Sequence, residues 1–240
     1  MITIALIGYG KMGRAIEKIA LSRGHRIGLK IDLENGSDLT AENLSKNDVA
    51  IEFTGPSSAP GNLRKCLEAG IPVVCGSTGW LKEYDSVKTA FEKKGTAFLY
   101  ASNFSIGVNI FFELNKKLAE LMGSHPEYKV SLREIHHTQK KDAPSGTAIT
   151  LAEQVMERIP SLKNWVNEPA HSAAELAIIS ERIDPAPGIH EVIYSSAIDD
   201  LEIRHTAHNR EGFAGGAVLA AEYIYNKKGV FSMKDVLGFE

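Results

Sequence analysis

The stretch ITIALIGYGKMGRAIEKIALSRG, residues 2–24, decides how the chain begins to fold. Its first six residues form an apolar run rich in β-branched side chains, which is typical of a buried strand. The glycine cluster GYGKMG follows at once, and the apolar spacing after it predicts a helix that ends at Gly24. A strand, a tight turn and a helix in this order predict the first unit of an α/β domain with a parallel sheet.

The glycines of that turn match the spacing G-x-G-x-x-G of dinucleotide-binding loops. Gly8 permits a tight turn, Gly10 lets the backbone approach a pyrophosphate, and Gly13 lets the helix touch the strand. The amides and the positive dipole at the start of the helix favour a bound phosphate, so Lys11 and Met12 are expected at the same site. Three glycines can also merely punctuate a loop, but the strand before them and the helix after them favour cofactor binding.

Asp32 follows the second predicted strand, about 20 residues beyond the glycines, as the dinucleotide fingerprint requires. A carboxylate at this point would accept hydrogen bonds from the adenosine ribose hydroxyls. Leu33 stands next to it in place of a basic residue, which favours NADH because a 2′-phosphate would meet an unopposed carboxylate. NADPH stays open, since Lys11, Arg14 and Lys30 are near enough in sequence to neutralise a phosphate.

The alternation of strand and helix continues well beyond the glycine turn. Apolar runs predict strands at residues 49–53, 72–75 and 97–100, with helices at residues 59–69 and 82–93 between them. This order predicts a Rossmann-type parallel sheet with helices on both faces, whose ligands lie beyond the carboxyl ends of the strands. The loops at those ends are ordinary turns or further cofactor-binding sites, and their candidate residues are Phe53, Thr54, Gly76, Ser77, Thr78, Ala101, Asn103 and Phe104.

A different pattern begins after residue 105. One longer amphipathic helix leads into predicted strands at residues 128–137, 174–182, 189–196 and 201–208, with a helix at residues 147–159 among them. These segments predict a second α+β domain whose sheet is mixed, mostly antiparallel, and covered on one face. We expect a dinucleotide-binding domain made of residues 1–105 and 214–240, the helical tail included, and a substrate-binding and oligomerisation domain made of residues 106–213.

The composition excludes several classes of protein. Of 240 residues, 43% are hydrophobic and 24% are charged, so the chain can bury a core without metals or disulfides. A net charge of −3 argues against a nucleic-acid binder, which would carry a basic face. Cys66 and Cys75 lack the spacing of metal ligands, so no metal is expected. The start of the chain resembles neither a signal peptide nor a membrane span, which predicts a cytoplasmic protein that binds no membrane.

The densest polar stretch is EIHHTQKKDAPSGTA, residues 134–148. Histidine titrates near neutral pH and can deliver a proton, but His136 and His137 would point to opposite faces of a strand and are not expected to share one role. Lys140 adds a positive charge, and Ser145 is placed to cap a helix whose start could bind a carboxylate. A solvated edge with an ordinary capping serine would have the same residues, so these residues alone leave the site open.

This stretch also carries a family resemblance. It matches the signature E-x-H-x-x-x-K-x-D-x-P-S-G-T-A at every specified position, and on it the chain resembles the dihydrodipicolinate reductases. The segments GSTG at 76–79, ASNFS at 101–105 and RHTAHNREGFAGGA at 204–217 resemble further parts of that family. The chain departs from many relatives at Gly8-Tyr9-Gly10, where they have G-x-x-G-x-x-G, at Ser77, where threonine is common, and in a shorter loop after Asp32.

The resemblance implies a reductase of 4-hydroxy-tetrahydrodipicolinate (dihydrodipicolinate) that uses NADH, NADPH or both, forms tetrahydrodipicolinate in lysine and diaminopimelate biosynthesis, and assembles as a homotetramer. It implies that His136 donates the proton, and that Lys140 assists it while also binding the small dicarboxylate substrate. It further implies substrate carboxylates held by His137, Ser145, Gly146 and Thr147. Arg210 resembles a family arginine near the domain junction, with its role left open.

Two other functions are compatible with these features. A related amine or amino-acid dehydrogenase would use the same scaffold to oxidise a primary amine. A non-catalytic NAD(H)-binding sensor would need the glycine turn but would not require His136, Lys140 and the helix start at Ser145 together.

Overall fold

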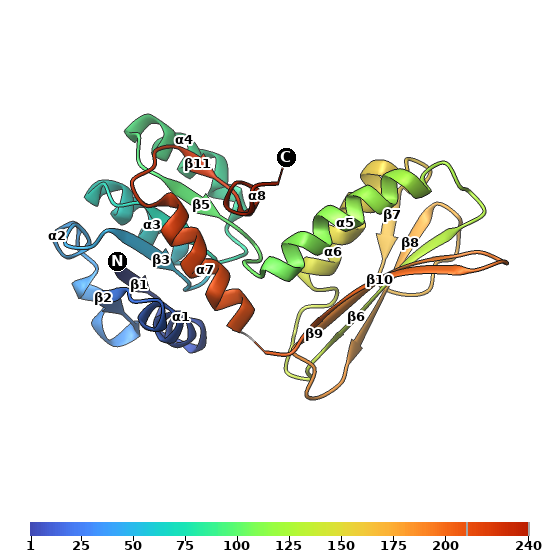
Figure 1. The fold of residues 1–240 in the computed structure, drawn as a ribbon, viewed down its shortest axis with the longest axis horizontal. Helices are drawn as coiled ribbons and strands as arrows, with labels where there is room; N and C mark the ends of the chain where they lie inside the picture. Colours follow the sequence, from blue (N-terminus) through green and yellow to red (C-terminus); the bar gives the residue numbers. More distant parts are fainter. Residues whose placement is uncertain (210, 240) are drawn as a thin grey trace. The chain divides into compact units, whose positions relative to one another are not determined.

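The computed structural model describes residues 1–209 and 211–239, which form two compact units (Figure 1). The first unit comprises Met1–Ile106 and the chain from Glu211 onward, and the second begins at Gly107 and comprises the residues between. The crossings lie where helices α5 (Ile106–Met122) and α7 (Glu211–Ile224) begin, close to the predicted crossings at residues 105 and 214. Arg210, singled out in the sequence, lies outside the described residues.

The first unit is a six-stranded sheet in the order β11-β5-β4-β3-β1-β2, in which every pairing is parallel. The predicted Rossmann-type sheet is therefore confirmed. The strand order reverses between β1 and β3, which puts the predicted ligand crevice at the carboxyl ends of these two strands. The strands are β1 (Thr3–Ile7), β2 (Arg26–Ile31), β3 (Val49–Glu52), β4 (Val73–Cys75), β5 (Phe98–Tyr100) and the short, unpredicted β11 (Val230–Phe231).

Helices cover both faces of this sheet. Side chains alternate along β1, so that Ile4 and Leu6 pack under one layer of helices while Ala5 and Ile7 pack under the other. Each isoleucine or leucine buried in this way contributes about 1.5–3 kcal/mol relative to an exposed one. The first layer contains α1 (Lys11–Ser22), α7 and α8 (Met233–Leu237). The second layer contains α2 (Ala41–Leu44), α3 (Ala59–Ala69) and α4 (Tyr84–Lys94). The unit also has two 3₁₀ turns, η1 (Leu33–Asp38) and η2 (Leu81–Glu83).

The second unit packs α5 and α6 (Gly146–Arg158) on one face of a five-stranded sheet in the order β10-β9-β6-β8-β7. The predicted mixed sheet is confirmed, and its pairings divide equally: β9 is antiparallel to β6 and β10, and β8 is parallel to β6 and β7. The parallel pairs arise because α6 carries the chain from the end of β6 back to the start of the sheet. The strands are β6 (Lys129–His136), β7 (Asn164–Val166), β8 (Glu175–Arg182), β9 (Gly188–Ser195) and β10 (Asp200–Ala207).

Within the described part of the chain, every helix is too short or too polar to span a membrane.

The tail of the chain is held in the first unit through α7, which lies beside α1 on the same face of the sheet (Figure 1). A Cβ added at Gly216 would lie 1.7 Å from the carbonyl oxygen of Phe104, whereas one added at Gly215 would meet nothing closer than Ile19 Cδ1 at 3.9 Å. The neighbouring glycines of one helix therefore differ sharply in the space around them.

We expect Gly216→Ala to destabilise the protein by about 3 kcal/mol, because the added methyl group overpacks a backbone contact that cannot yield easily. Gly215→Ala is the matched control, and it should leave stability unchanged or raise it by up to about 1 kcal/mol through better helix propensity. Urea unfolding of both variants measures the difference. Equal stability of the two would mean that α7 does not press on Phe104 in solution.

Candidate functional site

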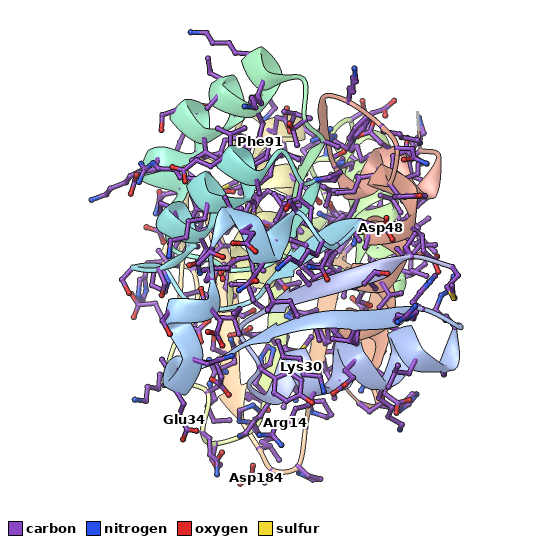
Figure 2. The ribbon with its side chains drawn as sticks, turned by 90° about the vertical axis from the view of Figure 1, so that its left-hand side faces the viewer. Arg14, Lys30, Glu34, Asp48, Phe91 and Asp184 are labelled. Carbon is purple, nitrogen blue, oxygen red and sulfur yellow. The ribbon has the colours of Figure 1, made fainter. Side chains whose placement is uncertain are left out.

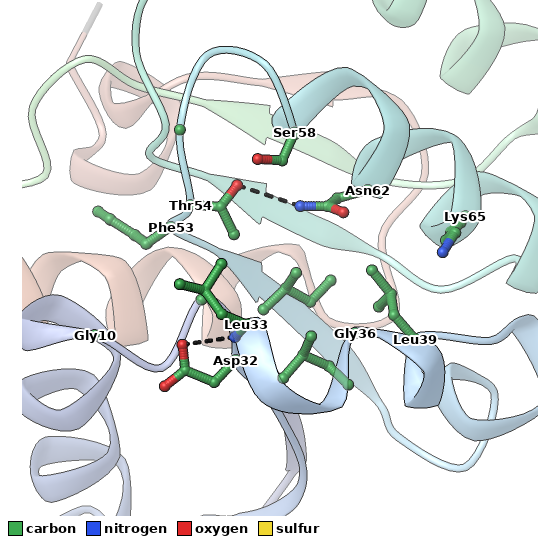
Figure 3. Close-up of a pocket in the computed structure, with 14 residues that line it drawn as sticks. Gly10, Asp32, Leu33, Gly36, Leu39, Phe53, Thr54, Ser58, Asn62 and Lys65 are labelled. Atoms are coloured by element: carbon green, nitrogen blue, oxygen red, sulfur yellow. Dashed lines mark hydrogen bonds between the residues drawn. The ribbon is translucent and has the colours of Figure 1, made fainter.

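Two pockets open at the carboxyl ends of the strands in the first unit. One, of about 510 Å³, extends from the glycine turn past Asp32 to α3 (Figure 3). The other, of about 480 Å³, lies between the glycine turn and the loop after β4. Both are lined by Gly10, Phe53, Thr54 and Gly55, so they form one elongated groove at the reversal of strand order. This groove is the crevice in which doubly wound sheets bind their ligands.

The glycine turn leaves room for a phosphate by close backbone packing. Gly8 has a φ of +96°, and a Cβ there would lie 2.1 Å from the carbonyl oxygen of Phe53. A Cβ on Gly13 would lie 2.3 Å from the carbonyl oxygen of Gly8, so the start of α1 rests directly on the turn. No atom lies within 4 Å of a Cβ on Gly10, which leaves open space in front of the helix amides. These residues fit a pyrophosphate.

Asp32 lies exposed at the rim of this groove, where its carboxylate accepts a hydrogen bond from the Leu33 amide over 2.9 Å (Figure 3). Leu33 is 99% exposed and brings no charge to the rim. The nearby Lys30 ammonium lies 2.6 Å from Glu17 Oε1 and 4.9 Å from the centre of the Tyr9 ring. The positive charge of Lys30 is thus already matched by a carboxylate. Tyr9 also hydrogen-bonds to Glu17.

Arg14 lies on the same ring, with its guanidinium 5.2 Å from the centre of Tyr9. Figure 2 shows Arg14 and Lys30 near one another at this edge of the first unit. Tyr9, which stands between the two glycines of Gly8-Tyr9-Gly10, therefore packs its ring against two basic side chains.

Glu52, which the sequence analysis did not select, organises the loops after β3 and β4. It is fully buried, and its carboxylate accepts hydrogen bonds from the amide and hydroxyl of Thr54, from Asn62 and from the Cys75 thiol. The Thr54 amide also donates to Ser77 Oγ over 2.8 Å, which joins the two loops. Burial and the adjacent Glu52 raise the pKa of the Cys75 thiol, so it stays neutral. A charged residue inside the apolar run VAIEF was the available signal for this role.

Most of the predicted cofactor residues line the groove: Gly8, Gly10, Lys11, Met12, Asp32, Phe53, Thr54, Gly76, Ser77 and Thr78. The rest lie behind it. Gly13 supports the turn, Phe104 packs against Phe53 with ring centroids 5.6 Å apart, and the Ala101 amide donates to the backbone at Cys75. Asn103 is 9% exposed and accepts from the Ser105 amide. Sequence reasoning missed lining residues that no motif marks, namely Gly36, Leu39, Ser58, Asn62 and Lys65 (Figure 3).

In the second unit, the predicted proton donor lies in a buried polar cluster. His136 is 7% exposed, and its Nδ1 lies 3.3 Å from Glu134 Oε2, two residues earlier on the same face of β6. His190 of β9 packs edge-on against His136, with ring centroids 5.1 Å apart. Its Nε2 lies 3.2 Å from Ser145 Oγ. Glu134 and His190 therefore lie next to the imidazole of His136.

The Glu134 carboxylate has no exposed surface and gathers donors from three segments. Its Oε1 accepts from the Ser145 amide at 3.0 Å, from Ser180 Oγ at 2.8 Å and from Arg182 Nη2 at 3.3 Å. Burial alone would raise the pKa of Glu134, but the adjacent His136 imidazole and the hydrogen bonds from Ser145 and Ser180 outweigh it and hold that pKa well below its usual range. The carboxylate is therefore charged at neutral pH.

These side chains also have the composition of a metal site. Glu134, His136 and His190 bring ligand atoms within 4.8 Å of one another, the one such group among residues 1–209 and 211–239. Arg182 lies against the same carboxylate and would oppose a second cation there. The hydrogen bonds and the Arg182 cation around the carboxylate account for this cluster without a metal.

The start of α6 divides its polar groups between the protein and the surface. Ser145 is 3% exposed; its amide donates to Glu134, and its hydroxyl accepts from the Ala148 amide as the predicted helix cap. Gly146 follows it on the surface, and the Gly146 and Thr147 amides begin the helix. Lys140 forms an ion pair with Asp142 over 2.7 Å. The amide and the hydroxyl of Ser145 thus already have partners within the protein. That Ser145 also contacts the substrate stays a prediction.

Comparison with known proteins identifies the family. The family model described as "Dihydrodipicolinate reductase, N-terminus" matches residues 2–104, and "Dihydrodipicolinate reductase, C-terminus" matches residues 107–237.

The chain belongs to the dihydrodipicolinate reductase family.

Relatives in this family agree along nearly the whole chain, which confirms the resemblance seen in the sequence. The 4-hydroxy-tetrahydrodipicolinate reductase of Christiangramia forsetii is 50% identical over 236 residues, covering 98% of this chain and 97% of that protein. The 4-hydroxy-tetrahydrodipicolinate reductase of Methanosarcina barkeri is 34% identical over 222 residues, covering 90% of this chain and 82% of that protein. The solved structure of a dipicolinate-bound dihydrodipicolinate reductase from Paenisporosarcina sp. TG-14 shares the fold, with a TM-score of 0.76, 24% identity and 97% of each chain covered.

The histidine cluster makes stability depend on pH. Burial, with a smaller effect of the neighbouring His136, lowers the pKa of His190 from 6.5 to about 3. An unfolded chain therefore binds a proton between these values that the folded chain does not bind, and folded stability falls as pH falls through this window.

We expect the free energy of unfolding to decrease from pH 6.5 to pH 5 by about 1 kcal/mol per pH unit more in the wild type than in His190→Gln. Glutamine retains a group that can hydrogen-bond to Ser145 but does not titrate. Urea titrations at both pH values measure the two slopes. Parallel slopes for the two proteins would contradict a neutral, buried His190.

Proposed function

We propose that the chain reduces 4-hydroxy-tetrahydrodipicolinate to tetrahydrodipicolinate with a nicotinamide cofactor, in diaminopimelate and lysine biosynthesis. The observation that carries this proposal is the buried pair of His136 and Glu134 beside the start of α6, together with the dinucleotide groove of the first unit. The names of the curated relatives support the same reaction. Reduction of this kind adds a hydride to one atom of a double bond and a proton to its neighbour.

The first unit would hold the cofactor and the second the substrate. The turn from Gly8 to Gly10 and the start of α1 would bind the pyrophosphate, and Asp32 would accept from the ribose hydroxyls. A nicotinamide bound there would supply the hydride for carbon four of the substrate ring. We also propose a cytoplasmic location, because the proposed reaction is biosynthetic and uses a nicotinamide cofactor.

His136 would give the matching proton to the neighbouring ring carbon. An imidazole can carry a proton and pass it on, as a general acid must. Lys140 would leave Asp142 for a substrate carboxylate, and the amides of Gly146 and Thr147 would face the other, helped by the dipole of α6. His137, half-buried directly after β6, would contribute a further donor to the same anion. Fixing both carboxylates orients the ring before reaction, which is where most of the rate gain arises.

We expect His136→Gln to lower kcat by a factor of about 10² to 10⁴ with little change in KM, because the reaction loses its general acid while the carboxylate contacts persist. The assay follows consumption of NADH with freshly formed substrate. His125→Gln, an exposed histidine of the same unit, is the matched control and should retain full activity. Near-normal turnover of His136→Gln would remove His136 from the donor role. If the wild-type protein binds NADH but does not reduce the substrate, the result would favour a non-catalytic NAD(H)-binding sensor. If it instead oxidises a primary amine, the result would favour an amine or amino-acid dehydrogenase.

The rim of the cofactor groove favours NADH over NADPH. Asp32 would face the ribose, its neighbour Leu33 is exposed and uncharged, and Lys30 is matched by Glu17. A 2′-phosphate would therefore meet a carboxylate with little compensation.

Leu33→Arg should raise kcat/KM for NADPH relative to NADH by about tenfold or more, because a guanidinium pairs well with a phosphate. The side chain is fully exposed, so folding should not change. Leu33→Gln adds a polar group without charge and should leave the ratio near that of the wild type. An unaltered ratio in Leu33→Arg would mean that residue 33 does not face the 2′ position.

We propose further that the protein is a homotetramer assembled through the second sheet. Within the described residues of the second unit, no helix packs on the face of that sheet opposite α5 and α6. This face presents the half-buried Ile179, Ile189 and Ile193. Ion pairs of Arg133 with Glu181 and Glu191 surround these isoleucines. A half-apolar sheet face of this kind is typical of a surface covered by another copy. Light scattering on the purified protein tests it, and a monomer would contradict it.

A further inference from the structure

The two oxygens of the Glu134 carboxylate contact different groups. Oε1 accepts the Ser145 amide, so it holds the residue that caps α6. Oε2 faces Nδ1 of His136 at 3.3 Å. One rigid, fully buried group thus touches both the imidazole and the helix start that the proposed reaction uses. Neither the hydride step nor the binding of carboxylates has so far required Glu134 itself.

The other nitrogen of His136 points toward a residue that has no side chain. A Cβ added at Gly188 would lie 3.2 Å from His136 Nε2 and 3.4 Å from its Cδ2. Glu134 therefore occupies the Nδ1 side of the ring, while Gly188 leaves room on the Nε2 side. In a ring held in this way, Nδ1 faces the protein and Nε2 is available to a ligand.

We propose that Glu134 is the positioning residue of the reaction: it keeps Nδ1 of His136 protonated, so that Nε2 delivers the proton, and it fixes that nitrogen relative to the start of α6. The inference rests on the proposed function of His136. A carboxylate behind a histidine sets the tautomer and the orientation of its ring and stabilises the protonated form.

The other charged and titratable groups near the ring do not replace Glu134. His190 on β9 is neutral because burial lowers its pKa to about 3. Arg182 on β8 stands in register with His136, but it is a cation and is shared between Glu134 and the Asp142 carbonyl. Lys140 is paired with Asp142 in the loop after β6. Glu134 is therefore the anion that favours a protonated His136.

The first test compares Glu134→Gln with the wild type across pH. The amide matches the carboxylate in size but carries no charge, so the protonated imidazole loses its counter-ion. We expect kcat to fall by about 10- to 100-fold, and the decline of kcat/KM on the alkaline side to move about one pH unit lower, because an opposite charge at this range favours the charged form by at least that much. KM for NADH should not change.

Two further variants separate charge from packing. Glu134→Asp keeps the charge on a shorter arm, so it should restore the alkaline decline to its wild-type position while kcat stays reduced. Glu153→Gln makes the same chemical change at an exposed position of α6 and should behave as the wild type. Loss of activity in Glu134→Gln with an unshifted pH profile would overturn the inference and leave only a structural role.

A second measurement reads the tautomer in the wild-type protein, with His136→Gln used only for assignment. Nitrogen-15 NMR of labelled histidine, with the His136 signals assigned by their loss in His136→Gln, reports which nitrogen carries the proton. We expect Nδ1 to stay protonated throughout and Nε2 to titrate. A neutral ring protonated at Nε2 would overturn the inference whatever the activity. A wild-type protein inactive on the proposed substrate would instead overturn the proposed function, since the tautomer does not depend on turnover.

Discussion

A carboxylate with no exposed surface controls how the second unit is built. Moving an ion out of water costs several kcal/mol even in a relaxed protein interior, and each hydrogen bond to a charged group returns about 1.5–3 kcal/mol. Glu134 therefore needs several donors at once. It takes them from the loop before α6 and from β8, and the His136 imidazole of its own strand lies 3.3 Å away. Because no single partner offsets the cost, these three segments must come together in one arrangement for the unit to be stable.

The register of the mixed sheet is what allows this arrangement. Glu134 stands opposite Ser180 on one side and His190 on the other, and His136 stands opposite Arg182. A slip of one residue would turn each of these side chains to the opposite face of the sheet and leave the carboxylate without donors. The parallel strand β8 is essential here, since it brings a hydroxyl and a guanidinium to the carboxyl end of β6. Fold and site are therefore linked through the crossover helix α6, which places β8 beside β6 and is capped by Ser145.

The first unit uses a related device with a different purpose. Glu52 is also fully buried at the end of a strand, and it binds the Thr54 and Asn62 side chains behind the cofactor groove. The carbonyl of Phe53 in turn lies so close to Gly8 that no side chain fits between them. A buried acid thus fixes the loop after β3, and the fixed loop determines the conformation that the glycine turn must adopt. In both units, the groups that would meet a ligand are held by a carboxylate that would not.

Local rules were sufficient to predict the parts of the molecule that follow from neighbours in sequence. The turn at Gly8, the cap at Ser145 and the buried strand β1 depend on residues within one turn or strand, and all three are present in the structure. Ser180 and His190 were not foreseeable in the same way. They lie 46 residues from Glu134 and 45 from Ser145, and only the register of the sheet brings them into the cluster.

Burial then separates two kinds of residue that a sequence motif presents alike. In the stretch from 134 to 148, Glu134 and Ser145 are buried and form their polar contacts within the protein. Gly146, in contrast, lies exposed at the start of the helix. His136 stands between these extremes, with Nδ1 turned toward Glu134 and Nε2 toward the space beside Gly188. A residue whose polar atoms are all engaged internally can act on a substrate only by holding another residue in place. Burial, rather than proximity in sequence, therefore divides the motif into residues that hold other groups and residues that can touch a substrate.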